Sequence, residues 1–298
     1  MSINLYSYGV DCFIFIVSLV SLLSFRIIKY WAKAIIISNL NIFVLKITFL
    51  GTGTSQGVPV VACQCTVCQS SDKYDKRLRS SILIEAGETT LVVDSGPDFR
   101  QQMLKAEVRE IDAILLTHEH YDHIAGLDDI RAFNWVQQRP TDIYATARVQ
   151  KSIRQIFSYV FAAKKYPGIP QMNLFEIENA PFKVKGHEVI PITVLHYRLP
   201  VTGYRIGKFA YITDMKTIKT EEKEKLKGLE VLVVNALRKE EHLSHMNLER
   251  ALKLIAEVQP QKAFLTHLSH QMGLHAEVSK ELPANVELAY DGLEVEVI

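Results

Sequence analysis

A dense cluster of histidines directly follows a short apolar run near the middle of the chain. Residues 113–116 have the composition of a buried β-strand, and residues 117–123 then read Thr-His-Glu-His-Tyr-Asp-His. Open α/β sheets bind their ligands at the carboxyl ends of strands, so the cluster stands where a site would form. Three imidazoles and a carboxylate in so short a stretch are typical ligands of zinc and similar divalent metals. Burying them without an ion would be costly, and the sequence therefore predicts a metal site at a strand end.

The ligands are numerous enough to serve two adjacent ions. Alternate side chains of an extended segment point to the same side. In an extended segment the side chains of His118, His120 and Asp122 would therefore point to the same side, and His123 begins the next turn. Further candidates follow strand-like runs: His196 after 189–195, Asp214 after 209–213 and His267 after 263–266. Each would cap a strand, so we expect all of them on one rim, where an aspartate between two ions can bridge them.

From residue 46 onward the chain has the alternating pattern of an α/β protein. Runs rich in Ile, Val, Leu and aromatic residues predict buried strands at 46–50, 81–85, 90–94, 113–117, 209–213, 231–235 and 263–266. Residues 86–88 (Ala-Gly-Glu) predict a hairpin turn. Helices are expected at roughly 124–135, 149–159 and 247–258. Residues 46–298 are therefore expected to form one α/β domain.

Residues 1–45 differ from this pattern, and we assign them to a separate hydrophobic extension. Their charged residues are Asp11, Arg26, Lys29 and Lys33, and the run 12–25 is apolar and uncharged. That run is shorter than the roughly 20 residues a helix needs to cross a bilayer. A secretory signal is disfavoured, because no basic residue precedes the run and no small-x-small cleavage site stands out. An over-extended start site, a short membrane anchor and a folded part of the domain remain as interpretations, and all three place the domain in the cytoplasm.

The charge balance and the cysteine count limit which kinds of partner we expect the protein to bind. The chain has 34 Lys+Arg against 33 Asp+Glu, so nothing indicates general affinity for nucleic acid or for an anionic membrane. Four cysteines in 298 residues are too few for a disulfide scaffold. A small-molecule substrate is the expectation, with membrane association only if residues 1–45 are an anchor.

Three of the cysteines form a compact motif of their own. Cys63, Cys65 and Cys68 have the spacing Cys-x-Cys-x2-Cys, which leaves a tetrahedral zinc site one ligand short. His270, three residues after His267, could complete it. The alternative is a set of reduced surface thiols. His245 stands where a loop enters the helix expected at 247–258, and its alternative is an exposed neighbour of the helix cap.

The pattern His-x-His-x-Asp-His, followed by His196, Asp214 and His267, resembles the metallo-β-lactamase superfamily of dinuclear hydrolases. The resemblance implies a four-layer αβ/βα sandwich. It also implies that His118, His120 and His196 hold one ion, that Asp122, His123 and His267 hold the other, and that Asp214 bridges them.

The cysteine motif and His245 make the chain similar to one branch of that superfamily, the PhnP-like phosphodiesterases that cleave phosphoribosyl 1,2-cyclic phosphate. The similarity covers residues 46–298, including 51–59 (Gly-Thr-Gly-Thr-Ser-Gln-Gly-Val-Pro). It implies a structural zinc held by Cys63, Cys65, Cys68 and His270, two Zn²⁺ or Mn²⁺ ions in the catalytic site, catalytic roles for Asp122 and His245, and a homodimer. The substrate itself is an inference from resemblance, because one fold hosts many chemistries.

Two other functions compete with this hypothesis. An RNA 3′-end endonuclease of the tRNase Z type usually carries a Gly-rich basic arm, and the stretch 159–170 is too short and too weakly basic to be one. A non-catalytic metal-binding adaptor would be expected to have lost ligands, and none is missing here.

A few residues are left with open roles. The loop 51–57 could approach a phosphate through its backbone N–H groups or be a tight turn. Asp94 could hold a histidine ligand or cap a helix. His187, His242 and His275 have no motif around them and are expected to be surface or packing residues.

Overall fold

Many strands of this protein are apolar on both faces, which explains why they lie inside a layered structure. The computed structural model describes residues 44–164 and 166–298. In β4 (Ala113–Leu115), Ala113 and Leu115 belong to a core between two sheets, and Ile114 belongs to a second core beneath helices. Strands buried on both faces have no polar side, so they give continuous apolar runs in the sequence.

The first sheet has seven strands in the order β15-β1-β2-β3-β4-β5-β6. Their bounds are β1 (Leu45–Gly51), β2 (Ser81–Ala86), β3 (Thr89–Val93), β4, β5 (Thr141–Ala145), β6 (Met172–Glu176) and β15 (Glu294–Val297). The strands from β3 to β6 run parallel, and β15, β1, β2 and β3 pair antiparallel. The β2–β3 hairpin confirms the predicted turn at residues 86–88.

The second sheet follows the order β11-β8-β9-β10-β12-β13-β14, with β7 paired to β8. Its strands are β7 (Phe182–Val184), β8 (His187–His196), β9 (Leu199–Ile206), β10 (Phe209–Ile212), β11 (Thr217–Ile218), β12 (Val231–Asn235), β13 (Lys262–Thr266) and β14 (Val286–Leu288). The strands β10, β12, β13 and β14 are parallel, so their carboxyl ends share one edge of the sheet.

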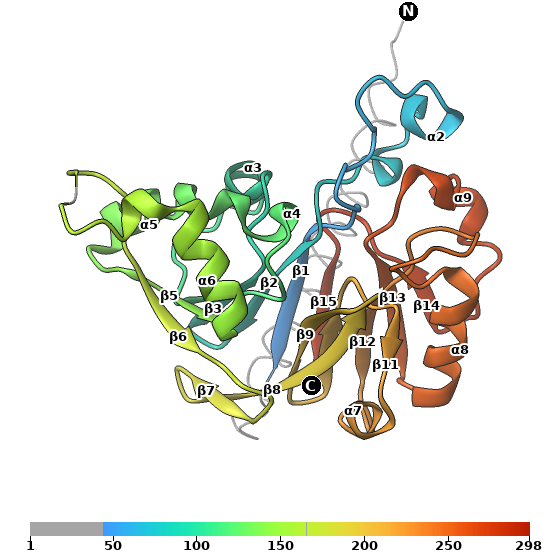
Figure 1. Ribbon diagram of the computed structural model, residues 1–298. Coiled ribbons are helices and arrows are strands. Elements are labelled where there is room, and N and C mark those ends of the chain that lie inside the picture. The colour runs from blue at the N-terminus through green and yellow to red at the C-terminus, as the bar shows by residue number, and fades with distance from the viewer. Residues whose placement is uncertain (1–43, 165) are drawn as a thin grey trace, which may run out of the picture. The chain divides into compact units, whose positions relative to one another are not determined.

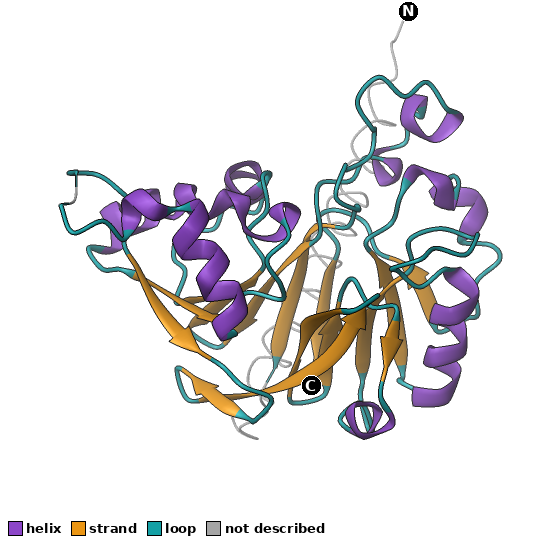
Figure 2. Cartoon of the chain, viewed as in Figure 1, coloured by secondary structure: helices purple, strands orange, loops and turns teal. Residues whose placement is uncertain are grey.

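Helices cover the outer face of each sheet and complete a four-layer sandwich (Figures 1 and 2). On the first sheet lie α3 (Phe99–Lys105), α4 (Tyr121–Ile124), α5 (Arg131–Gln137) and α6 (Ala147–Ile156). The second carries α7 (Thr220–Glu224), α8 (Leu248–Val258) and α9 (His275–Val278), and α2 (Thr66–Gln69) lies in the loop after β1. This architecture confirms the predicted αβ/βα sandwich.

The predicted strands all exist, whereas several real strands carry no clear signal. Strand β6 is mostly exposed along its length and β9 contains Pro200 and Gly203, so neither gives a continuous apolar run. The helix expected at 124–135 is wrong in its first half. Residues 125–130 form a 3-10 stretch because the N–H of Gly126 bonds to the carbonyl of Ser95, 2.8 Å away, and α5 begins only at Arg131.

The extension assigned to residues 1–45 lies almost entirely outside the described residues, and β1 begins at Leu45. In the part of the chain that the structure covers, no helix combines the length and the apolar character needed to cross a membrane.

We predict that Gly126→Ala lowers the free energy of unfolding by about 1–3 kcal/mol, because its new Cβ would overlap the carbonyl oxygen of Gly96. In a domain of this size each kcal/mol lowers the melting temperature by about 2–4 °C, which calorimetry resolves. Gly87→Asn is the control: nothing lies within 4 Å of its added Cβ, and Asn tolerates the positive φ of that turn. An unchanged melting temperature for Gly126→Ala would contradict the close approach.

Candidate metal centre

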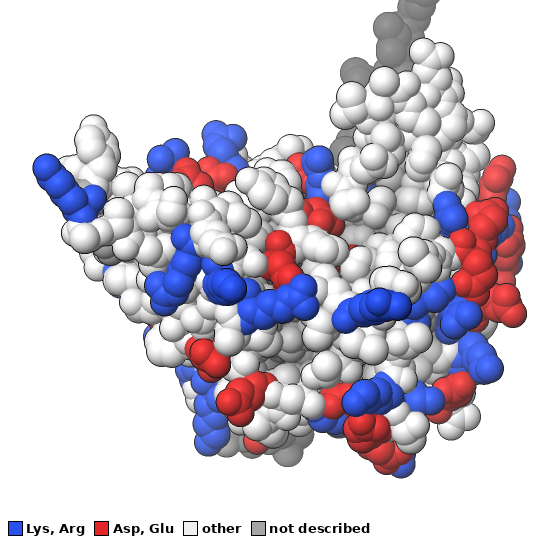
Figure 3. All heavy atoms as spheres, viewed as in Figure 1, with Lys and Arg blue, Asp and Glu red and all other residues white. Residues whose placement is uncertain are grey.

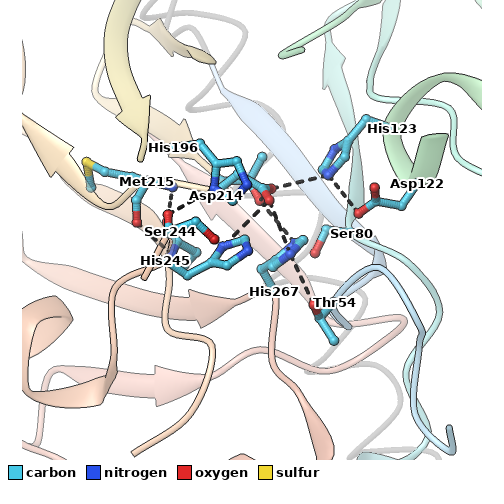
Figure 4. Close-up of polar contacts among 12 residues, drawn as sticks. Thr54, Ser80, Asp122, His123, His196, Asp214, Met215, Ser244, His245 and His267 are labelled. Atoms are coloured by element: carbon cyan, nitrogen blue, oxygen red, sulfur yellow. Dashed lines mark hydrogen bonds and ion pairs between the residues drawn. The ribbon is translucent and has the colours of Figure 1, made fainter. Parts of the chain in front are cut away.

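The ends of strands from both sheets bring predicted ligands together, and Figure 4 shows Asp122 and His123 beside His196, Asp214 and His267. We call this group the strand-end cluster: His118, His120, Asp122 and His123 after β4, His196 at the end of β8, Asp214 after β10 and His267 after β13. Ligand atoms within 4.8 Å of one another form three sets, which are His118, His123 and Asp214; Asp122, His123 and His267; and His196, Asp214 and His245. Asp214 and His123 each belong to two sets, and of these two side chains the carboxylate of Asp214 has two oxygen atoms with which it could bridge two ions.

His120 lies on the outer side of the cluster. Its side chain is exposed, whereas His118 and His123 are fully buried. The ring centroid of His120 is 4.5 Å from that of His118 and 5.2 Å from that of His196. The centroids of His118 and His196 are 6.1 Å apart, and His120 belongs to none of the three sets, so a single ion held by these three histidines stays a prediction.

Unpaired nitrogens in the cluster fit a cation. The Nε2 atoms of His118 and His123 are buried and have no hydrogen-bond partner among the described residues. His123 Nε2 lies 3.0 Å from Asp122 Oδ2 and 3.2 Å from Asp214 Oδ2. Buried polar atoms normally have partners, and lone pairs that face one another across such distances repel unless a positive charge lies between them.

A buried carboxylate sets which nitrogens are free. Asp94, after β3, accepts hydrogen bonds from the backbone N–H of Thr117 at 2.9 Å, from Thr117 Oγ1 at 2.8 Å and from His123 Nδ1 at 2.6 Å. Because the Thr117 hydroxyl donates to Asp94, it accepts from His118 Nδ1, 3.0 Å away. Both rings thus carry a proton on Nδ1 and turn Nε2 toward the cluster. This Nε2 is bare in the neutral ring of His118, whereas at His123 the nearby carboxylates favour a positive charge there, either a second proton or a metal ion. Asp94 orients ligands and does not cap a helix.

The second sheet orients its histidines in the same way. His196 Nδ1 donates to the carbonyl of Ser244 at 2.9 Å, which leaves Nε2 free. His267 Nε2 lies 3.2 Å from Thr54 Oγ1 and 3.3 Å from Asp214 Oδ1. The loop 51–57 therefore contributes the Thr54 side chain to the site. The backbone N–H groups of Gly53, Thr54 and Gly57 already donate to backbone carbonyls, so these three are not available to a phosphate.

The backbone is strained where it delivers three of these side chains. Asp94, Asp214 and His267 have φ values of 65°, 56° and 56°, in the left-handed region. Such conformations cost of order 1–3 kcal/mol each and persist at functional sites, where the surrounding structure imposes them. Each follows a buried strand, so the chain turns sharply to aim the side chain into the cluster.

The charges of the cluster favour a cation as well. Burial opposes protonation of His123, but the carboxylates of Asp122 and Asp94 outweigh it and raise the pKa of His123 well above its usual value. At His118 burial dominates and lowers the pKa, so that ring is neutral and able to ligate. Negative charge is therefore concentrated around His123 Nε2.

His245 lies beside the cluster, at the edge nearest β8. Its ring centroid is 4.4 Å from that of His196 and 5.0 Å from that of His267, and its Nδ1 is 3.6 Å from Asp214 Oδ1. That Nδ1 is buried and has no hydrogen-bond partner in the described chain. Burial lowers the pKa of His245 to about 3. The alternative of an exposed cap neighbour is wrong, because the side chain is 8% exposed.

The cysteine cluster (Cys63, Cys65, Cys68 and His270) forms a second, separate group. The three Sγ atoms lie 3.3, 3.3 and 3.5 Å from His270 Nδ1. The backbone N–H of Cys68 and the His270 ring lower the pKa of Cys65 to about 6. One imidazole and three thiols, one of them a thiolate at neutral pH, form the donor set of a closed tetrahedral zinc site.

Several contributing residues were missed by sequence reasoning. Thr117, Thr54 and Ser244 position the histidine ligands, but as single polar residues in loops they carry no pattern. His242 was expected to be a surface or packing residue, and its ring packs against that of His245 with 5.2 Å between the centroids; it also lines a pocket. His275 packs on Tyr74, as expected.

Comparison with known proteins agrees with this geometry. A family model described as "Beta-lactamase superfamily domain" matches residues 89–268. A solved structure of a diphosphatase from the PhnP family is 35% identical, with a TM-score of 0.80, over 85% of this chain and 97% of the other. Zn²⁺-bound PqqB from Methylobacterium extorquens, 21% identical with a TM-score of 0.70 over 85% of this chain and 100% of the other, shares the fold.

A curated relative, the Octanoyltransferase of Porphyromonas gingivalis, is 46% identical over 254 residues. The match covers 84% of this chain and 51% of the relative, so this chain spans about half the relative's length.

The chain therefore belongs to the metallo-β-lactamase superfamily. The family implies divalent metal ions as the cofactors of such a domain.

We predict that Asp94→Asn weakens metal binding by about 10- to 100-fold, because the amide cannot accept all three hydrogen bonds that orient His118 and His123. Competition with a chromogenic zinc chelator measures this loss. Asp112→Asn is the matched control, because Asp112 bonds to Thr90 and Arg139 at the opposite end of β4. Equal zinc affinity in Asp94→Asn and the wild type would contradict the orienting role.

Proposed function

We propose that the protein is a dinuclear-metal phosphodiesterase that acts on a small substrate such as phosphoribosyl 1,2-cyclic phosphate. The observation that carries the proposal is the 35% identity to a PhnP-family diphosphatase across 97% of that chain. A phosphodiester and a diphosphate both present a phosphorus atom with a bridging oxygen that must leave. Figure 3 supports an anionic substrate, because a broken band of Lys and Arg crosses the face it shows, from α6 toward α8.

The proposed ligand sets follow the strand-end cluster. His118, His120 and His196 would hold one ion, Asp122, His123 and His267 the other, and Asp214 would bridge them. Zinc and manganese both suit these nitrogen and oxygen ligands, whereas the thiolates of the cysteine cluster select zinc. Bound there, two divalent ions would supply a water of lowered pKa and polarise a phosphoryl oxygen.

The protein's own groups would orient and protonate the reactants. The Asp122 carboxylate, at the end of the cluster near His123, would accept a hydrogen bond from the attacking water and fix its direction. His245 would donate a hydrogen bond or a proton to the leaving oxygen. Burial disfavours the charged ring in the free protein. An anionic phosphoryl group beside His245 would raise its pKa, because an opposite charge favours the protonated form.

A second candidate is hydrolysis of an octanoyl ester or thioester. It is favoured by the 46% identity to half of an Octanoyltransferase. The same water attacking an acyl carbon would accomplish it. Hydrolysis of an octanoyl ester gives no role to the polar residues that line the pocket beside His245, and we therefore rank it second.

The substrate class can be tested directly with the metal-loaded protein. We expect hydrolysis of bis(4-nitrophenyl) phosphate and, with a kcat/KM several decades higher, of phosphoribosyl 1,2-cyclic phosphate. Asp122→Ala serves as the blank, since it removes both a ligand and the group that orients water. Octanoyl-pantetheine and a precursor tRNA are the competing substrates. A higher kcat/KM for either of them than for the phosphodiesters would overturn the proposal.

We predict that His245→Gln lowers kcat by about 10²–10⁴-fold while the metal content stays that of the wild type. Stopped assays and elemental analysis of the same sample measure both quantities. His187→Gln, at the opposite end of β8 from His196, is the matched control and keeps its kcat. Loss of metal from His245→Gln would instead show that this residue is a ligand, as its proximity to His196 and Asp214 allows.

We propose that the cysteine cluster stabilises the fold and contributes less to the rate of catalysis. Cys65→Ser removes one zinc ligand, and we expect the melting temperature to fall by about 4–8 °C, equivalent to about 2 kcal/mol. The kcat of the enzyme that remains folded should fall by less than the kcat of His245→Gln does. A variant as stable as the wild type but without turnover would contradict this division of labour.

A further inference from the structure

A polar pocket lies between the strand-end cluster and the cysteine cluster. It has a volume of about 260 Å³, and His245 of the first group and His270 of the second both line it. Its other polar walls include Arg238, His242, Gln271 and Ser269. Because His245 borders both the pocket and Asp214, a ligand in the pocket would be adjacent to the reacting centre.

The described part of the chain gives the pocket hydrogen-bond donors and no carboxylate. No Asp or Glu of residues 44–164 or 166–298 lines it. Arg238 donates to neutral partners, from Nη1 to Gln271 Oε1 at 2.7 Å and from Nη2 to the carbonyl of Glu241 at 2.9 Å. Its Nε is buried without a hydrogen-bond partner, and the described residues provide no carboxylate in ion-pair contact with it. A guanidinium so placed carries an uncompensated positive charge.

Two neighbours of Arg238 add donors. The backbone N–H of Ser244 donates to His242 Nδ1 at 3.3 Å, so the neutral ring of His242 carries its proton on Nε2. Gln271 uses its Oε1 to accept from Arg238, which leaves its amide N–H groups to donate. Three different donors thus converge on one volume, an arrangement suited to the several acceptor oxygens of a phosphate.

The pocket wall is held in place before any ligand arrives. The carbonyl of Arg238 accepts from Leu248 N–H at 2.9 Å, and that of Lys239 accepts from Asn247 Nδ2 at 3.0 Å. The N–H of Ser269 donates to the carbonyl of Leu237 at 2.9 Å. Binding therefore requires little ordering of the loop, which lowers its entropic cost.

We propose that this pocket binds a second anionic group of the substrate, a phosphate monoester, while the phosphoryl group to be hydrolysed lies at the strand-end cluster. The inference rests on the proposed phosphodiesterase function and adds a specificity determinant to it. Arg238 would bind this phosphate through charged hydrogen bonds, and His242 and Gln271 would donate further hydrogen bonds to it. The preferred substrate would then be a phosphodiester that also carries a terminal phosphate.

The test compares one cyclic phosphodiester with and without that group. Ribose 1,2-cyclic phosphate is assayed beside its 5-phosphorylated form, and the ratio of the two kcat/KM values is the readout. We expect a ratio of about 10 to 100 in the wild type, as charged hydrogen bonds provide. Arg238→Gln and His242→Ala should each move the ratio toward one, and Arg238→Lys should keep part of it.

Lys239→Ala is the matched control, because Lys239 is exposed, pairs with Glu281 and does not line the pocket. It should keep the wild-type ratio. A wild-type ratio near one, or a ratio that survives in both Arg238→Gln and His242→Ala, would overturn the inference. A merely structural role for Arg238 would lower both kcat/KM values and leave the ratio intact.

Binding separates this inference from the proposed function. If neither cyclic phosphate is hydrolysed, the proposed function fails, and calorimetry with ribose 5-phosphate still probes the pocket. We expect binding at least about 10-fold weaker in Arg238→Gln than in the wild type, with ribose as the ligand that should not bind. Equal affinity of both proteins for ribose 5-phosphate would refute the pocket's role.

Discussion

The site depends on one carboxylate that is removed entirely from water. Asp94 is 0% exposed, and it joins β3 to the loop after β4 through Thr117 and His123. An uncompensated buried charge is expensive, so the loop that satisfies Asp94 has little freedom to take another shape. In satisfying it, the loop turns the Nε2 atoms of His118 and His123 toward Asp214 of the other sheet. The same hydrogen bonds thus stabilise the loop and select the tautomer of each histidine ligand.

The parts predictable from sequence are those that repeat a simple rule. A strand buried on both faces gives an unbroken apolar run, as in β4 and β12. A ligand residue directly after such a run is expected where the carboxyl ends of the strands meet. Features set by tertiary contacts gave no comparable signal. Strand β6 is exposed and β9 is interrupted by Pro200 and Gly203, so both were missed. The 3-10 stretch before α5 arises because Gly126 bonds to Ser95, a contact that no local pattern encodes.

The candidate site shows the same limit. Its histidines and aspartates were recognised because they are dense and recur after strands. The residues that aim them are single hydroxyls and carbonyls, whose importance exists only in three dimensions. His242 and Arg238 illustrate this further. Their loop carries no motif, and the pocket forms because α8 and the segment after β13 hold that loop against His270.

The antiparallel pairing of β1 with β15 has a consequence for how this domain can be combined with others. Leu45 pairs with Val297 at one end of strands β1 and β15. Gly51 lies at the other end of β1, which is the end that faces the metal ligands. A polypeptide joined to Leu45 or Val297 would be attached at the end of these strands away from Gly51. The point of attachment of such a fusion would therefore be remote from the metal ligands. A relative about twice as long, of which this fold accounts for half, is the kind of architecture that this placement permits.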